Sequence, residues 1–244
     1  KLLVDTHNNL WIGKGSGQGL DKMPLDHYTL GDVPVFEHFR HDPNDIHSLS
    51  DNSLYSFCED KFNDIWIGTF GNGINYYSSR AKKFNVVNEN SGKNIKIQNN
   101  LINAFAEDEK LLYIGTEAGL DVYDKNKKTT THYNNIPGDS QSLSANPVYA
   151  LLKDSQGMIW VGTWAGGLNR FDPATRTFKR FMPDGKPGSI SNGNIFTILD
   201  DRKGSLWVGT IGGGLNRYDY KTGAFRNYLN DFANPNGLHG DMVD

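Results

Sequence analysis

The chain of 244 residues contains a single cysteine, Cys58. One thiol excludes an intramolecular disulfide and a cysteine-based metal cluster, and it says little about the redox compartment. The sequence also lacks a run of about 18 apolar residues and a basic segment followed by an apolar one. We therefore expect neither a membrane-spanning helix nor an export signal in this stretch, and an extracytoplasmic location stays open.

The charges give no sign of a nucleic-acid partner. The chain has 25 Lys and Arg against 28 Asp and Glu, for a net charge of −3. The two signs alternate, and no block of about five or six basic residues occurs that could follow a phosphate backbone. We expect no nucleic-acid binding in this region.

The motifs of common catalytic and metal sites are missing as well. There is no HExxH, no His/Cys spacing suited to zinc, no calcium loop, no GxSxG and no P-loop. The string "GKGSGQG" at 13–19 lacks the helix that a phosphate cradle requires. His38, His41 and His47 are close in sequence, but they are predicted on a strand end and a loop. We expect no metal, no cofactor and no catalytic residue in this region.

Glycine and aromatic residues are abundant, and one sequence segment recurs. The 27 glycines and 12% aromatic content suit strands and turns. "WVGTWAGGLNRFDP" at 160–173 returns as "WVGTIGGGLNRYDY" at 207–220. Aligning all copies on their aromatic residue gives five units, the last four of them at intervals of 47 residues, centred on Trp11, Trp66, Tyr113, Trp160 and Trp207. Periods of about 40–50 residues are typical of propellers or helical arrays.

The pattern inside each unit favours a propeller. An apolar run such as "VYALLKD" is followed by a tight turn, by "IWVGT", by a glycine turn, by "LNRFD" and by a short aromatic segment. No segment reaches about ten residues at helical spacing, so four short strands per unit is the simplest interpretation. We predict an all-β fold, a β-propeller of four-stranded blades, with five repeats forming one domain over residues 1–244.

The repeated residues are predicted to be structural. We expect the five central aromatic residues to pack between blades, and the glycine two residues after each to allow close backbone approach. An Asn, Gly or Asp recurs before each first strand, at positions where left-handed turn dihedrals would explain the choice. These positions are Asn52, Asn100, Asn146, Gly193 and Asp241.

The ends of the sequence lie inside repeats. "KLLVDTHNNLW" at the start matches "ALLKDSQGMIW", and "GLHGDMVD" at the end matches "SLSANPVY". Either the last segment completes the first blade in a five-bladed ring, or the chain is an arc of a longer propeller. The phase of the repeats does not separate the two options.

The unit "SLSxNxVYALLxDxxGxIWVGTxxGGLNRFDPxTxxFxRF" resembles the two-component-regulator propeller repeat. The similarity is strongest at 142–181 and 189–228, weaker at 94–133, and interrupted by an insertion around "PLDHYTLGDVP". The resemblance implies a larger propeller of about seven blades, in the periplasmic sensor region of a Bacteroides-like hybrid histidine kinase. It also implies adjoining propeller or other domains in the same chain, a homodimer in the full-length protein, and control of glycan-use genes through sensing of oligosaccharides.

One loop position varies among otherwise similar repeats, and it is the candidate ligand site. It holds Phe70, Glu117, Trp164 and Ile211. An exposed Trp164 could stack on a sugar ring while Glu117 or an Asn such as Asn146 accepts hydroxyl protons. The alternative is that Trp164 seals the neighbouring blade.

Three classes of function remain open at this point. The first is a non-catalytic sensor that binds a glycan fragment or relays its binding. The second is a lyase similar to streptogramin lyases, which would need a His/Glu set and a metal in the central channel. The third is a protein-interaction scaffold. We expect the first, with kinase activity confined to other domains.

Overall fold

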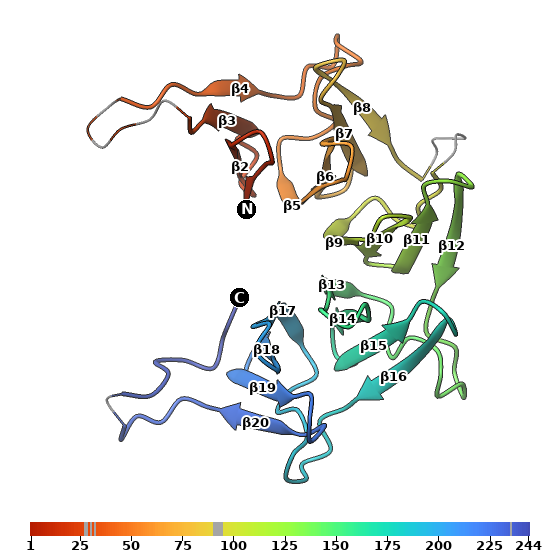
Figure 1. The fold of residues 1–244 in the computed structure, drawn as a ribbon, viewed down its shortest axis with the longest axis vertical. Helices are drawn as coiled ribbons and strands as arrows, with labels where there is room; N and C mark the ends of the chain where they lie inside the picture. Colours follow the sequence, from red (N-terminus) through yellow and green to blue (C-terminus); the bar gives the residue numbers. More distant parts are fainter. Residues whose placement is uncertain (27–28, 30, 32, 90–94, 235) are drawn as a thin grey trace. The chain divides into compact units, whose positions relative to one another are not determined.

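The computed structural model describes residues 1–26, 29, 31, 33–89, 95–234 and 236–244. These residues form twenty β-strands and no helix (Figure 1). The strands are β1 Leu2–Val4, β2 Asn9–Gly13, β3 Leu20–Pro24, β4 Glu37–Phe39, β5 Leu54–Glu59, β6 Ile65–Thr69, β7 Ile74–Ser78, β8 Lys83–Val87, β9 Ile102–Glu107, β10 Leu111–Thr116, β11 Gly119–Asp124, β12 Thr129–Tyr133, β13 Val148–Lys153, β14 Ile159–Thr163, β15 Leu168–Asp172, β16 Thr177–Phe181, β17 Ile195–Asp200, β18 Ser205–Thr210, β19 Leu215–Asp219 and β20 Phe225–Tyr228.

The strands form five four-stranded sheets, each with its strands in chain order. The pairings of β1 with β2, β5 with β6, β13 with β14 and β17 with β18 are antiparallel, as short hairpin connections require. One repeat therefore makes one sheet, because its turns fall where the sequence places glycine and aspartate. The prediction of an all-β fold with five four-stranded blades is confirmed, and the total of about seven blades stays a prediction.

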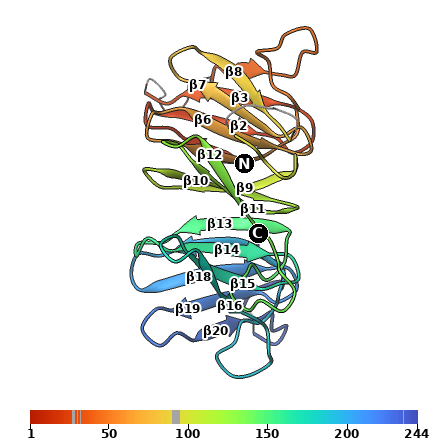
Figure 2. The same ribbon diagram turned by 90° about the vertical axis from the view of Figure 1, so that its right-hand side faces the viewer.

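The chain divides into two compact units. The first comprises 1–114 and 123–131, and the second comprises 115–122 and 132–244. Within the first unit β5 packs against β9, and within the second unit β13 packs against β17. Figure 2 shows the same strands from the side. Each unit thus buries its sheet faces by stacking successive sheets.

The central aromatic residues lie between stacked sheets. Trp11, Tyr113 and Trp160 are at most 1% exposed, and Trp66 is 6% exposed. Trp160 contacts Tyr218 and Tyr220 of the following sheet, while the ring contacts of Trp207 are with Tyr228 and Arg217 of its own sheet. Trp207 is accordingly only half-buried, unlike the expectation that it would be as buried as its counterparts.

The glycines after these aromatic residues permit close packing, as predicted. A Cβ on Gly162 would lie 2.5 Å from Cγ2 of Ile195, at the start of the next sheet. A Cβ on Gly68 would lie 2.6 Å from Cγ2 of Ile102, the equivalent residue of β9. Any side chain would push the first strands apart, so the repeat requires glycine here.

The segment 24–34, which lengthens the first repeat, includes residues 27–28, 30 and 32, outside the described part. Among the described residues, no helix is long and apolar enough to cross a membrane.

Candidate ligand-binding face

The loops between second and third strands lie against the linkers that join successive sheets. In the second unit the amide of Trp164 donates to the carbonyl of Pro147 at 2.9 Å, and that of Gly167 donates to the carbonyl of Gly193 at 2.9 Å. The first unit repeats this arrangement, where Phe70 donates to the carbonyl of Ser53 at 3.1 Å. Within each unit these two sets of loops therefore lie on one face. We call this the loop face.

Asn146 and three of its four equivalents bind a neighbouring linker through a side-chain oxygen. Oδ1 of Asn146 accepts the amide of Asn135 at 2.7 Å, and Oδ1 of Asn52 accepts that of His41 at 2.7 Å. Oδ1 of Asp241 accepts the amide of Asn230 at 2.6 Å. None of the five equivalent residues has a positive φ, so the explanation from turn dihedrals is wrong. At four of the five positions the side-chain oxygen instead accepts an amide of the linker that follows the outer strand, and Gly193 has no side chain to do so.

Trp164 belongs to a cluster of three rings in the second unit, which we call the ring cluster. Its ring centroid lies 5.6 Å from that of Tyr149, and Tyr149 lies 5.8 Å from Phe196. Trp164 is 40% exposed, and the other two residues are half-buried. Trp164 therefore presents apolar surface to solvent while it rests on a ring of the adjoining strand.

β-Bulges place the other two rings. The pairing of β13 with β14 shifts between Val148 and Ala150, and that of β17 with β18 shifts between Ile195 and Thr197. Tyr149 and Phe196 are the extra residues at these shifts. A bulge re-aims the side chain that it carries and is common beside functional sites.

Phe70 has a separate place, in the first unit. It is 55% exposed and stacks on Tyr55, with a centroid separation of 5.2 Å and an interplanar angle of 26°. Tyr55 is again the bulged residue, because the pairing of β5 with β6 shifts between Leu54 and Ser56. Phe70 and Trp164 thus occupy equivalent positions in different units.

Glu117 lies half-buried on the loop face of the second unit, at the position that Trp164 holds one repeat later. Glu117 lies in a tight turn, in which Oγ1 of Thr116 accepts the amide of Ala118 at 3.1 Å. The same hydroxyl donates to the carbonyl of Gly119 at 3.1 Å. This bonding fixes the backbone that carries Glu117.

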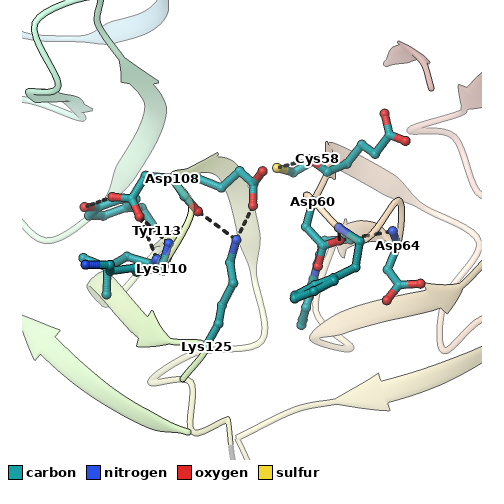
Figure 3. A network of polar contacts seen from close by, with 12 residues as sticks. Cys58, Asp60, Asp64, Asp108, Lys110, Tyr113 and Lys125 are labelled. Atoms are coloured by element: carbon teal, nitrogen blue, oxygen red, sulfur yellow. Dashed lines mark hydrogen bonds and ion pairs between the residues drawn. The ribbon is translucent and has the colours of Figure 1, made fainter. Parts of the chain in front are cut away.

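The hairpins at the opposite ends of the first two strands hold a polar network. In the first unit Asp60 accepts the indole N–H of Trp66 at 3.0 Å, and Asp108 accepts the hydroxyl of Tyr113 at 3.1 Å (Figure 3). Lys125 pairs with Glu107 and donates to the carbonyl of Asp108 at 2.9 Å. These groups satisfy one another, which is the pattern of a structural cluster.

Cys58 lies beside this network (Figure 3). Burial raises the pKa of its thiol to about 12, and the carboxylate of Glu107 acts in the same direction. The thiol is therefore protonated at neutral pH and is a poor nucleophile or metal ligand.

The three histidines that are close in sequence have different partners. Nδ1 of His38 lies 2.7 Å from Oδ1 of Asp21, whereas Nδ1 of His41 and of His47 lie 2.6 and 3.3 Å from backbone carbonyls. Across the described part of the chain, no group of three or more His, Cys, Asp or Glu side chains could hold a metal ion.

The sequence singles out Trp164 and Phe70 as candidates, but it does not single out the rings that pack beside Trp164. Tyr149 and Phe196 stand in apolar strand segments, where alternation alone gives no reason to single them out. The available signal was the recurrence of an aromatic residue at the second position of the first strand, in Tyr55, Tyr149 and Phe196.

Five four-stranded sheets, each formed by one repeat and stacked within each unit, are typical of a propeller-type fold. The family model for the two component regulator propeller matches residues 48–71, 142–165 and 189–212. Three segments of the chain are therefore similar to repeats of this family.

Comparison with individual proteins agrees with this assignment. The chain is 27% identical over 132 residues to "Histidine kinase P4" of Formosa agariphila, a match that covers 53% of this chain and 9% of that protein. A crystal structure from B. thetaiotaomicron, an extracellular domain assigned to a hybrid two component system, matches with a TM-score of 0.79 and 23% identity. That match covers 99% of this chain and 29% of the other.

A second structure from B. thetaiotaomicron, an extracellular domain assigned to a one component system, matches with a TM-score of 0.70 and 23% identity, over 93% of this chain and 30% of that one. At this identity the two structures establish the fold alone. The chain spans under a third of each solved domain and about a tenth of the curated relative.

Proposed function

We propose that this chain is part of the extracytoplasmic sensor of a two-component signalling protein, and that it binds an oligosaccharide at its loop face. In this proposal the protein is anchored in the inner membrane and the sensor lies in the periplasm. Ligand binding is relayed through further propeller and other domains of a homodimer, and it controls genes for glycan use. Catalysis is confined to kinase domains elsewhere in the protein.

The proposal rests on the partial exposure of Trp164. Trp164 is 40% exposed, whereas most of the central aromatic residues of the repeats are buried. A flat apolar ring held at a fixed angle by Tyr149 matches the C–H face of a pyranose. Amide and carboxylate groups of the neighbouring loops, including Glu117, supply acceptors for sugar hydroxyls.

Titration calorimetry with a panel of neutral and acidic oligosaccharides tests the proposal. For the sugar that binds, we expect Trp164→Ala to weaken affinity by about 1–3 kcal/mol, the size of an aromatic contact. Its melting temperature stays close to that of the parent, because the side chain is partly solvated.

Phe62→Ala is the matched control. Phe62 is also an exposed aromatic residue, at 52%, but it lies in the hairpin between β5 and β6 rather than on the loop face. Equal loss of affinity in both variants, or no binding to any sugar of the panel, would refute the proposed function. Lower stability of Trp164→Ala with unaltered binding would make Trp164 a structural residue.

A further inference from the structure

The ring cluster is contributed by three elements of the second unit. Trp164 comes from the loop after β14, Tyr149 from the bulge of β13, and Phe196 from the bulge of β17. Beside it, Oδ1 of Asn194 accepts the amide of Ala165 at 2.9 Å, which holds the loop carrying Trp164 against the next linker. The rings are therefore fixed in place before any ligand arrives, which lowers the entropic cost of binding.

The loop segments of the second unit carry more carboxylates than cations. They comprise 117–118, 134–147, 164–167, 182–194 and 211–214, which lie between strands, and 229–244, which follow β20. Their described residues include one lysine, Lys186, and no arginine. The carboxylates among them are Glu117, Asp139, Asp184, Asp231, Asp241 and Asp244.

The few cationic groups near these loops have partners already. Nζ of Lys186 lies 3.2 Å from Oδ2 of Asp184. The guanidinium of Arg180, on β16, donates to the carbonyls of Asp139 and Ser142 at 2.6 and 3.0 Å, and to the hydroxyl of Ser142 at 2.8 Å. Sugar acids and sulfated sugars are bound by cations that are available for paired hydrogen bonds. The loop segments of this unit instead carry an excess of carboxylates, which disfavours an anionic ligand.

We infer that the ring cluster of Tyr149, Trp164 and Phe196 binds an oligosaccharide that carries no carboxylate, sulfate or phosphate group. The inference rests on the proposed function and narrows its ligand class. Stacking on the rings needs no charge on the ligand. An acidic sugar needs a cationic partner, and the loop segments of this unit offer one paired ammonium against six carboxylates.

A matched set of ligands tests the charge requirement. The neutral oligosaccharide identified by calorimetry is compared with its derivative oxidised to carboxylates at the primary hydroxyls, and with the methyl ester of that derivative. We expect the acid to bind about tenfold more weakly than the ester, because the ester removes the charge and adds only one methyl group per carboxylate. Raising the ionic strength narrows that difference and leaves the affinity of the neutral sugar unchanged.

Variants of the bulged rings test the location. We expect Phe196→Ala and Tyr149→Ala each to weaken binding of the neutral sugar by about fivefold or more, while Phe62→Ala leaves it unchanged. Tyr149→Phe keeps the ring and guards against loss of folding, and we expect it to retain most of the affinity.

The outcomes separate the two levels of the proposal. A chain that binds acidic sugars more tightly than their esters keeps its sensor role but contradicts the inferred ligand class. Unchanged affinity in Phe196→Ala and Tyr149→Ala, with normal folding, contradicts the inferred location. A chain that binds no sugar at all contradicts both the proposed function and this inference.

Discussion

The indole N–H of Trp160 donates a hydrogen bond of 2.7 Å to Oδ2 of Asp154, six residues earlier in the chain. Oδ1 of the same aspartate accepts the amides of Gln156 and Met158 at 2.9 Å each. One carboxylate therefore closes the hairpin and orients the ring that packs between sheets. Trp11 with Asp5 and Trp66 with Asp60 repeat the pair at 2.7 and 3.0 Å.

The depth of burial predicts unequal costs for removing equivalent tryptophans. Trp160 is fully buried, and we expect Trp160→Ala to lower the free energy of unfolding by about 3–5 kcal/mol. Trp207 is half-buried, and its replacement by Ala costs about 1–3 kcal/mol, because less apolar surface is lost. Denaturant unfolding measures both values, and equal costs would contradict this reading of the packing.

The glycine after each central aromatic residue gives a second prediction. Gly162→Ala places a Cβ 2.5 Å from Ile195 and 3.1 Å from Ala150, and we expect it to cost about 1–3 kcal/mol of stability. Gly240→Ala is the control, because nothing lies within 4 Å of its added Cβ. We expect the control to change stability by less than about 0.5 kcal/mol. A neutral effect of Gly162→Ala in thermal unfolding would show that the sheets are not closely packed there.

Acid is expected to destabilise the fold through its hairpin aspartates. Burial acts to raise the pKa of Asp5, but hydrogen bonds from Trp11, Asn9 and His7 outweigh it and hold the pKa below its ordinary value of 3.8. A lowered folded-state pKa contributes stability above pH 3.8 that is lost as the pH falls through the folded-state value.

We therefore expect the free energy of unfolding to fall steeply below about pH 4. Asp21 adds to this fall, because Lys14 and His38 overcome its burial and lower its pKa. Asp5→Asn removes one titrating group. We expect its free energy of unfolding to fall less steeply than that of the parent protein between pH 6 and pH 2. An identical slope for the variant and the parent protein would assign the acid effect to other groups.

The repeat period is enough to predict most of the fold, whereas the candidate site depends on individual side-chain contacts. The recurrence of "WVGT" at Trp160 and Trp207 was enough to predict four-stranded sheets, because stacking of identical units requires identical buried residues. Trp164 could be singled out because it breaks the pattern at an exposed loop. Both features are local in the sequence.

The bulged rings and the linker bond of Asn146 could not be predicted in this way. Whether Tyr149 lies in a regular ladder or in a bulge depends on its register with β14, which the sequence of β13 alone does not determine. The bond from the amide of Asn135 to Asn146 spans 11 residues and forms only when the linker folds back. Burial of Trp207 likewise depends on which sheet covers it.

Indole NMR of the full chain tests the central claim, ligand binding at the loop face, most directly. The chain has five tryptophans, and the signal of Trp164 is assigned by its loss in Trp164→Phe. On titration with the bound oligosaccharide, we predict that the Trp164 indole signal shifts in proportion to saturation while the other four remain in place. Saturation of binding with an unmoved Trp164 signal, or a shift confined to the buried tryptophans, would contradict the claim.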